Sequence, residues 1–122
     1  MDDHMAGESN DLGRIEISPL AVATIASQAV LRSYGIVGMA AKSVVDGIAN
    51  ALTRDPRKGI EVHLDGDDVK IDVYVIVEYG TRISAVAHSV ANTVRFNIEK
   101  ALGVRVSEVN VHVQGLRVSN PD

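Results

Sequence analysis

The sequence predicts an α+β fold: a two-layer sandwich in which a small, mostly antiparallel sheet of three or four strands carries two long helices and one short helix on one face. Two patterns predict it. Residues 69–79 alternate apolar and mixed side chains, which is the period of a strand with one buried face. Residues 19–34 and 82–102 repeat apolar side chains every three or four positions, which is the period of an amphipathic helix. Such one-sided elements bury their apolar faces against each other in two layers.

The first elements expected are a short strand and a long helix. In "GRIEIS", Ile15 and Ile17 alternate with polar side chains, as in a strand. A helix then begins at Ser18-Pro19, because the serine hydroxyl can cap it and proline is tolerated in the first turn. We expect this helix to run to Tyr34 and to end at Gly35.

The first helix has a narrow polar strip made of Thr24, Gln28 and Arg32, and apolar residues cover the rest of its surface. So wide an apolar surface predicts burial on more than one side, against the sheet and a second helix. The following "GIVGMA" is expected to be a brief extended turn, and residues 44–52 a short amphipathic helix.

A β-hairpin is expected in the middle of the chain. Asp55-Pro56 and Gly59 mark "TRDPRKG" as a surface loop. Apolar residues then alternate over 60–64, and "DGDD" turns the chain into the strand at 69–79. The core face of that strand is expected to consist of Val69, Ile71, Val73, Val75, Val77 and Tyr79.

The last two elements are the longest helix and a closing strand. The helix is expected from Arg82 to Leu102, with Gly103 ending it. The closing strand follows, with Val109, Val111 and Val113 facing inward. One domain over residues 13–118 results, between a disordered acidic tail at 1–12 and a short C-terminal tail at 119–122.

Composition excludes several classes of function. The chain has 122 residues and no cysteine, which excludes disulfides, thiolate metal sites and cysteine nucleophiles. Asp2, Asp3, Glu8 and Asp11 carry the acidic excess, and the remaining twelve acidic residues balance twelve Lys and Arg. A balanced domain with an acidic tail is poorly suited to binding a phosphate backbone. No apolar run approaches the roughly 20 residues that span a bilayer, and the start does not have the order of a signal peptide.

The sheet face turned away from the helices is expected to be half apolar and open to solvent. It is our first candidate for contact with a protein partner, through Glu61, His63, Asp72, Tyr74, Ile76 and His112. His63 and His112 lie on different strands, and with a nearby carboxylate they form a set that zinc accepts. Solvated strand histidines are the simpler interpretation, so we expect no metal and no cofactor.

A second candidate contact surface lies on the last helix. Phe96 is the single phenylalanine of the chain and is expected nearly opposite the buried stripe, near Ser89 and Asn92. A large apolar side chain among small neighbours is typical of a contact anchor, although a single exposed phenylalanine is also common on ordinary surfaces.

The residues also resemble a known family. "GRIEIS", "KGIEVHLDGDDVKIDVYVIVEYG" and "RISAVAHSVANTVRFNIEKALGVRVSEVNVHVQGL" are similar to the bacterial alkaline-shock protein family, also called the envelope stress response or YloU-like family, over about residues 13–118. The resemblance implies a non-enzymatic protein linked to cell-envelope or alkaline stress. Some members are held at the cytoplasmic membrane by a separate anchored partner and self-associate. The resemblance supplies no catalytic residues.

We therefore expect a cytoplasmic protein that acts by protein–protein association and self-association, peripheral to the membrane through an anchored partner, with no direct membrane insertion, no small-molecule substrate and no enzymatic activity. No nucleophile–base motif or phosphate-binding loop contradicts this. The alternative is a small RNA-binding module of the RRM type, which stacks bases on aromatic residues of an open sheet. Only Tyr74 is available for that purpose on the expected face.

Overall fold

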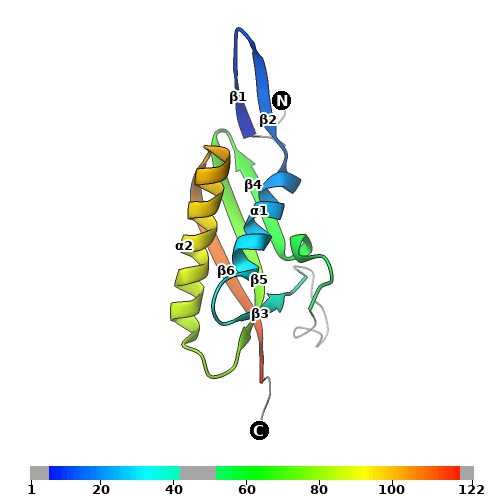
Figure 1. Cartoon of the computed structure of the whole chain (residues 1–122), viewed down its shortest axis with the longest axis vertical. Helices are drawn as coiled ribbons and strands as arrows, with labels where there is room; N and C mark the ends of the chain where they lie inside the picture. The colour runs from blue at the N-terminus through cyan, green and yellow to red at the C-terminus, as the bar shows by residue number, and fades with distance from the viewer. Residues whose placement is uncertain (1–5, 42–51, 119–122) are drawn as a thin grey trace.

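The computed structural model describes residues 6–41 and 52–118 of the chain (Figure 1). Two helices, a short 3-10 helix and six strands follow one another in this order: β1 (Ala6–Asn10), β2 (Gly13–Ile17), α1 (Pro19–Leu31), β3 (Ile36–Met39), the 3-10 helix η1 (Pro56–Gly59), β4 (Ile60–Asp65), β5 (Asp68–Glu78), α2 (Ile83–Leu102) and β6 (Arg105–Arg117).

Strand β5 is the centre of the main sheet. Its first half pairs antiparallel with β4, from Ile60↔Val73 to Asp65↔Asp68, and its second half pairs antiparallel with β3. Its other edge pairs with β6 along its whole length, and this pairing is parallel. The sheet is therefore mixed rather than mostly antiparallel. The reason is that α2 carries the chain from the end of β5 back to its beginning, and such a crossover brings the next strand in parallel.

The core lies between the sheet and the two helices, which both cover the same face (Figure 1). The inward-facing side chains of β5 from Val69 to Val77 are fully buried, as predicted, but Tyr79 lies one residue beyond the end of β5 and is 63% exposed. Both helices present a buried stripe to these valines: Val22, Ala26, Ala29 and Val30 from α1, and Val86, Val90, Val94 and Ile98 from α2. The two-layer arrangement of the prediction is thus present.

Local chemistry determines where the helices begin and end. The Ser18 hydroxyl accepts a hydrogen bond from the Ala21 N–H at 3.1 Å and caps α1, as predicted. Helix α1 ends at Leu31, three residues earlier than expected, and Tyr34 is exposed in the turn that follows rather than buried. Helix α2 ends as predicted at Gly103, which adopts a left-handed conformation.

The start of the chain differs from the prediction. Residues 6–10, expected to lie in a disordered tail, form β1 and pair with β2 as an antiparallel hairpin from Ala6↔Ile17 to Asn10↔Gly13. The turn is stabilised by the Asn10 side chain, whose Oδ1 accepts the Leu12 N–H at 2.8 Å. Such a local turn is hard to recognise because β1 itself has no apolar alternation.

Two further segments acquire regular structure from their neighbours. "GIVGMA" contains strand β3, because its backbone groups find partners on the second half of β5. The loop "TRDPRKG" contains η1, which Asp55 caps by accepting the Arg57 N–H at 3.1 Å. The short helix predicted at 44–52 lies outside the described residues except for Leu52, which forms an isolated β-bridge with Ala40.

Among the helices in the described part of the chain, none combines the length and the apolar character that crossing a membrane requires.

Gly35 links the helix layer to the sheet. Its φ is +87°, its carbonyl accepts the Glu78 N–H at 2.8 Å, and a Cβ at this position would lie 2.7 Å from a methyl carbon of Val86 on α2. We expect Gly35→Ala to lower the free energy of unfolding by about 2–4 kcal/mol, because backbone strain and overpacking add. Urea unfolding followed by circular dichroism measures this.

Gly66 provides the matched control for that substitution. It also has a positive φ, +63°, but its Cβ position meets nothing within 4 Å. Gly66→Ala should therefore cost only the backbone term, about 1–2 kcal/mol. Equal losses in the two variants would contradict the packing role assigned to Gly35.

Candidate functional site

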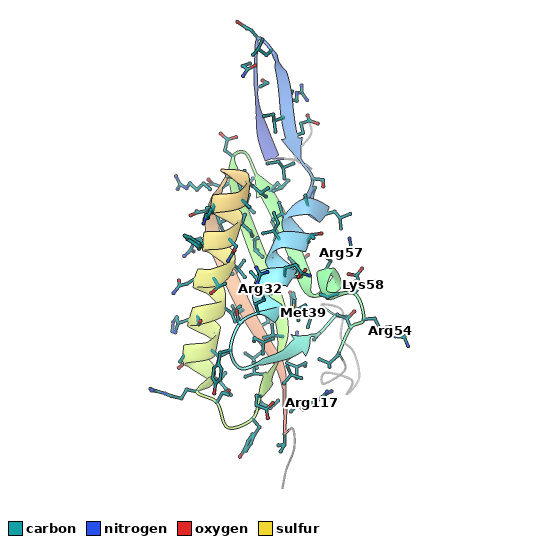
Figure 2. The ribbon with its side chains drawn as sticks, in the orientation of Figure 1. Arg32, Met39, Arg54, Arg57, Lys58 and Arg117 are labelled. Atoms are coloured by element: carbon teal, nitrogen blue, oxygen red, sulfur yellow. The ribbon has the colours of Figure 1, made fainter. Side chains whose placement is uncertain are left out.

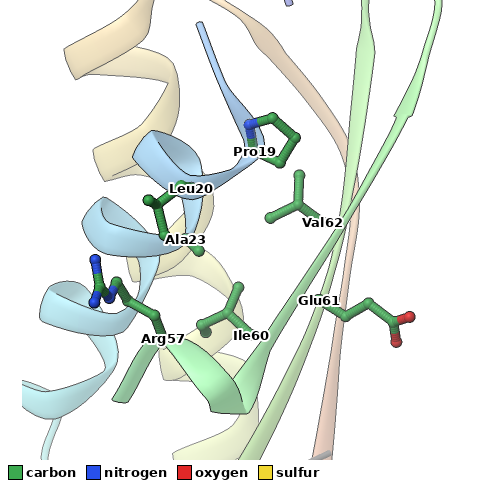
Figure 3. A pocket seen from close by; sticks show the side chains of 7 residues that line it. All are labelled: Pro19, Leu20, Ala23, Arg57, Ile60, Glu61 and Val62. Atoms are coloured by element: carbon green, nitrogen blue, oxygen red, sulfur yellow. The ribbon is translucent and has the colours of Figure 1, made fainter. Parts of the chain in front are cut away.

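The sheet face away from the helices carries a cluster of polar side chains on three neighbouring strands. Glu61 and His63 come from β4, Asp72 from β5 and His112 from β6. Because side chains alternate along β4, Glu61 and His63 face away from the core. Figure 3 shows Ile60 and Val62 turned towards α1 and Glu61 turned to the opposite side. Five of the six residues predicted on this face, these four and Tyr74, are therefore brought together.

Asp72 is the centre of the cluster. Its Oδ2 lies 3.0 Å from His63 Nε2, and its Oδ1 lies 2.9 Å from His112 Nε2. The strand register produces this arrangement. The direct neighbour of Asp72 on β4 is Glu61, and each histidine lies two residues beyond the direct neighbour of Asp72 on its own strand. Because β4 and β6 run in opposite directions, the two histidines lie on opposite sides of Asp72. One carboxylate thus binds an imidazole with each of its oxygens.

Asp72 is held in its charged form. Burial raises the pKa of this carboxyl group, but hydrogen bonds from His112, Asn110 and His63 together outweigh that effect and bring its pKa below the ordinary value. The side chain is 18% exposed, against 49% for His63 and 42% for His112. A fixed negative charge therefore lies beneath two accessible imidazoles.

Tyr74 and Ile76 do not form the open contact surface that the sequence predicts. The Tyr74 ring stacks on His112, with centroids 4.5 Å apart and planes 12° from parallel. Ile76 is fully buried, so its prediction as an exposed contact residue was wrong. Its register partners are Gly38 and Gly115, and Leu52 lies over the side of Gly38 on which a Cβ would stand. The chain itself therefore closes this sheet face around Ile76.

The helix face around Phe96 is exposed, as the sequence predicts. Phe96 is 60% exposed, and Ser89 and Asn92 are exposed beside it on α2. The ammonium group of Lys100 lies 5.5 Å from the centre of the Phe96 ring, within the range of a cation–π contact.

The β1–β2 hairpin, which we call the arm, is a surface that the sequence did not predict. It projects beyond the end of the sheet in Figure 1, and its strands make extensive contacts only with each other. Leu12 is 96% exposed and Ile15 is 61% exposed, while Ile17 at its base packs against the core. The alternation of Ile15 and Ile17 identified one strand of the arm but not its partner.

Cations gather around η1. Arg54, Arg57 and Lys58 are exposed and lie on one side of the molecule (Figure 2). The Arg57 guanidinium binds Asp55 at 3.0 and 3.1 Å and lowers the pKa of that carboxyl group through hydrogen bonds. Arg54 and Lys58 add further positive charge. We call Arg54, Arg57 and Lys58 the basic loop.

Two surface depressions show no arrangement for nucleophilic catalysis. One, of about 360 Å³, lies between α1 and β4 and is mainly apolar, with Arg57 at its edge (Figure 3). The other, of about 330 Å³, lies beside Tyr34 and the start of α2. The residues that line them do not combine a hydroxyl with a histidine or a carboxylate, which is the pair that nucleophilic catalysis needs.

Comparison with known proteins agrees with the resemblance seen in the sequence. Residues 7–118 match the model of the alkaline shock protein 23 family, which is described as having a cell envelope-related function. The chain belongs to this family. It shares 42% identity over 111 residues with YloU of Bacillus subtilis (strain 168), a match that covers 89% of this chain and 92% of YloU. The family resemblance is thereby confirmed.

Other relatives are less similar in sequence, and their matches also span most of each chain. A Streptococcus pyogenes protein is 35% identical over 87% of this chain and 89% of its own length. YqhY of Bacillus subtilis (strain 168) is 29% identical over 93% of this chain and 84% of YqhY. Among solved structures, a zinc form of a variant of MamM CTD superposes with a TM-score of 0.50 at 14% identity, covering 83% of this chain and 89% of that one. This last likeness concerns the fold alone.

Proposed function

We propose that this member of the alkaline shock protein 23 family is a non-enzymatic cell-envelope protein that acts by protein–protein association, first of all with other copies of itself. The family's cell envelope-related description supports the setting. The observation that carries the association is the arm, an isolated two-stranded sheet that exposes Leu12 and Ile15.

An isolated arm of this kind is unfavourable in water. A two-stranded hairpin is marginally stable by itself, because two strands have no third element on which to bury their apolar side chains. Covering a leucine or isoleucine is worth about 1.5–3 kcal/mol per side chain. Packing Leu12 and Ile15 against another protein therefore stabilises both the arm and the contact.

Charge favours a second copy of the chain as that protein. The N-terminal segment that contains the arm carries Asp2, Asp3, Glu8 and Asp11, and the first eleven residues include no lysine or arginine. The basic loop, distant from the arm on the same molecule, supplies positive charge of the complementary kind (Figures 1 and 2). Opposite charges on two surfaces of one chain attract one copy to the next and set their orientation.

The other two candidate surfaces are weaker supports for association. Phe96 is a single large apolar side chain, and Lys100 already covers part of its ring. On the sheet face, Ile76 is buried and Tyr74 is stacked on His112. That stacking also removes support for RNA binding, which needs an aromatic ring free to receive a base.

The double variant Leu12→Ser and Ile15→Ser tests the arm. We expect it to weaken self-association of the full chain by about tenfold or more, because each serine removes apolar area from the contact. Sedimentation equilibrium over a range of concentrations measures the change. The unfolding midpoint of the main domain should stay the same, since neither side chain lies in the core.

Phe96→Ser is the matched control, because it also replaces a large exposed apolar residue by serine. It should leave self-association unchanged. If Phe96→Ser dissociates the protein and the arm variant does not, α2 rather than the arm is the contact surface, and the proposal for the arm is wrong.

The charge contribution has its own test. Replacing Arg54 and Lys58 by glutamate should weaken self-association at low salt and have little effect at high salt, because mobile ions screen exposed charges. Arg57 is left in place, since it is held by Asp55. If the double variant weakened self-association equally at all salt concentrations, an electrostatic role for the basic loop would be excluded.

We also propose that the chain is cytoplasmic and reaches the membrane through an anchored protein partner. The absence of a membrane-crossing helix among the described residues is compatible with this. In fractionated cells, the chain should sediment with membranes, and protease treatment of those membranes should abolish its rebinding. Binding to protein-free vesicles of the same lipids would instead indicate direct contact with lipid.

A further inference from the structure

The polar cluster on the sheet face has features that association does not explain. Two carboxylates, Glu61 and Asp72, lie directly opposite each other on β4 and β5. Like charges at directly opposed positions of neighbouring strands are destabilising, unless a cation lies between them. His63 lies against both, with its Nε2 3.0 Å from Asp72 and 3.8 Å from Glu61.

A single imidazole nitrogen cannot serve both carboxylates equally. Nε2 of histidine carries at most one proton and can donate it along one direction. The ligand atoms of Glu61, His63 and Asp72 all lie within 4.8 Å of one another. Ligands about 2.0–2.2 Å from one tetrahedral ion are roughly 3.4 Å apart, so these three atoms need only small side-chain adjustments to surround it.

We propose that Glu61, His63 and Asp72 bind one divalent transition-metal ion of the zinc class on the sheet face. One imidazole and two carboxylates are a borderline-hard ligand set, which suits Zn²⁺ and its first-row neighbours better than Ca²⁺. Three protein ligands leave a coordination position open to solvent or to a group from another protein.

His112 acts as a positioning residue in this site. Its Nε2 lies 2.9 Å from Asp72 Oδ1, the carboxylate oxygen that does not face His63. Stacking against Tyr74 holds the His112 ring in place. A group that orients a ligating carboxylate in this way strengthens metal binding without touching the metal. The sequence drew attention to the two histidines with one nearby carboxylate, whereas the structure places two carboxylates with one of the histidines.

The site is open, so its ligands are accessible without a change of fold. The side chains of His63, Glu61 and Asp72 are 49%, 31% and 18% exposed. All three belong to strands paired in regular register, which fixes the positions from which their side chains extend.

Zinc titrated into the full-length chain tests the proposal by isothermal calorimetry. We expect one Zn²⁺ per chain, and a Zn²⁺-dependent rise of the unfolding temperature, because an ion that binds only the folded state stabilises it. His63→Ala and Asp72→Asn should each abolish both effects. His112→Ala should retain binding but weaken it by about 10- to 100-fold, as expected of a group that supports a ligand.

The two remaining histidines supply the controls. His88 is exposed on α2, and His4 lies near the acidic start of the chain. His88→Ala and His4→Ala should bind zinc as the unsubstituted chain does. Circular dichroism confirms that each variant is folded. Absence of zinc binding in the unsubstituted chain, or full binding in folded His63→Ala, would overturn the proposal.

Discussion

The main domain of this structure depends on the burial of β5. Its inward valines lie beneath both helices, and its two edges are occupied by β4 and β3 on one side and by β6 on the other. A strand in this position must satisfy all its backbone groups through neighbours, because no water reaches them. The parallel pairing with β6 follows from the same constraint, since α2 covers β5 and returns the chain to the beginning of that strand.

The same strand also organises the polar face. Because side chains alternate along β5, the residue between the buried Ile71 and Val73 is Asp72, which faces away from the core. Register with β4 and β6 then surrounds it with His63 and His112. The geometry that packs the core on one side therefore assembles the charged cluster on the other, and a shift of register by one residue would disrupt both.

The core of the main domain is fully packed, but large apolar side chains remain exposed at the periphery of the molecule. The arm, whose two strands have no third neighbour, exposes Leu12 in its turn and Ile15 on β2, and α2 exposes Phe96. The arm is the place at which we propose contact with another copy of the chain, because the core has no further room to receive its side chains. The proposed metal site and the proposed contact surface of the arm lie on different parts of the molecule, so each can be altered without the other.

The sequence by itself determined most of the local structure. It predicted the Ser18 cap, the Gly103 end of α2, the hairpin of β4 and β5, the core stripes of both helices and the exposure of Phe96, because each depends on side-chain period or on a cap that lies within a few residues.

Tertiary structure alone decided the rest. It made "GIVGMA" a strand by offering it the edge of β5, and it buried Ile76 between the glycines of neighbouring strands. It also brought Glu61, His63, Asp72 and His112 together from positions up to 51 residues apart. These outcomes depend on which strands become neighbours and in which register, and no local pattern in the chain encodes that choice.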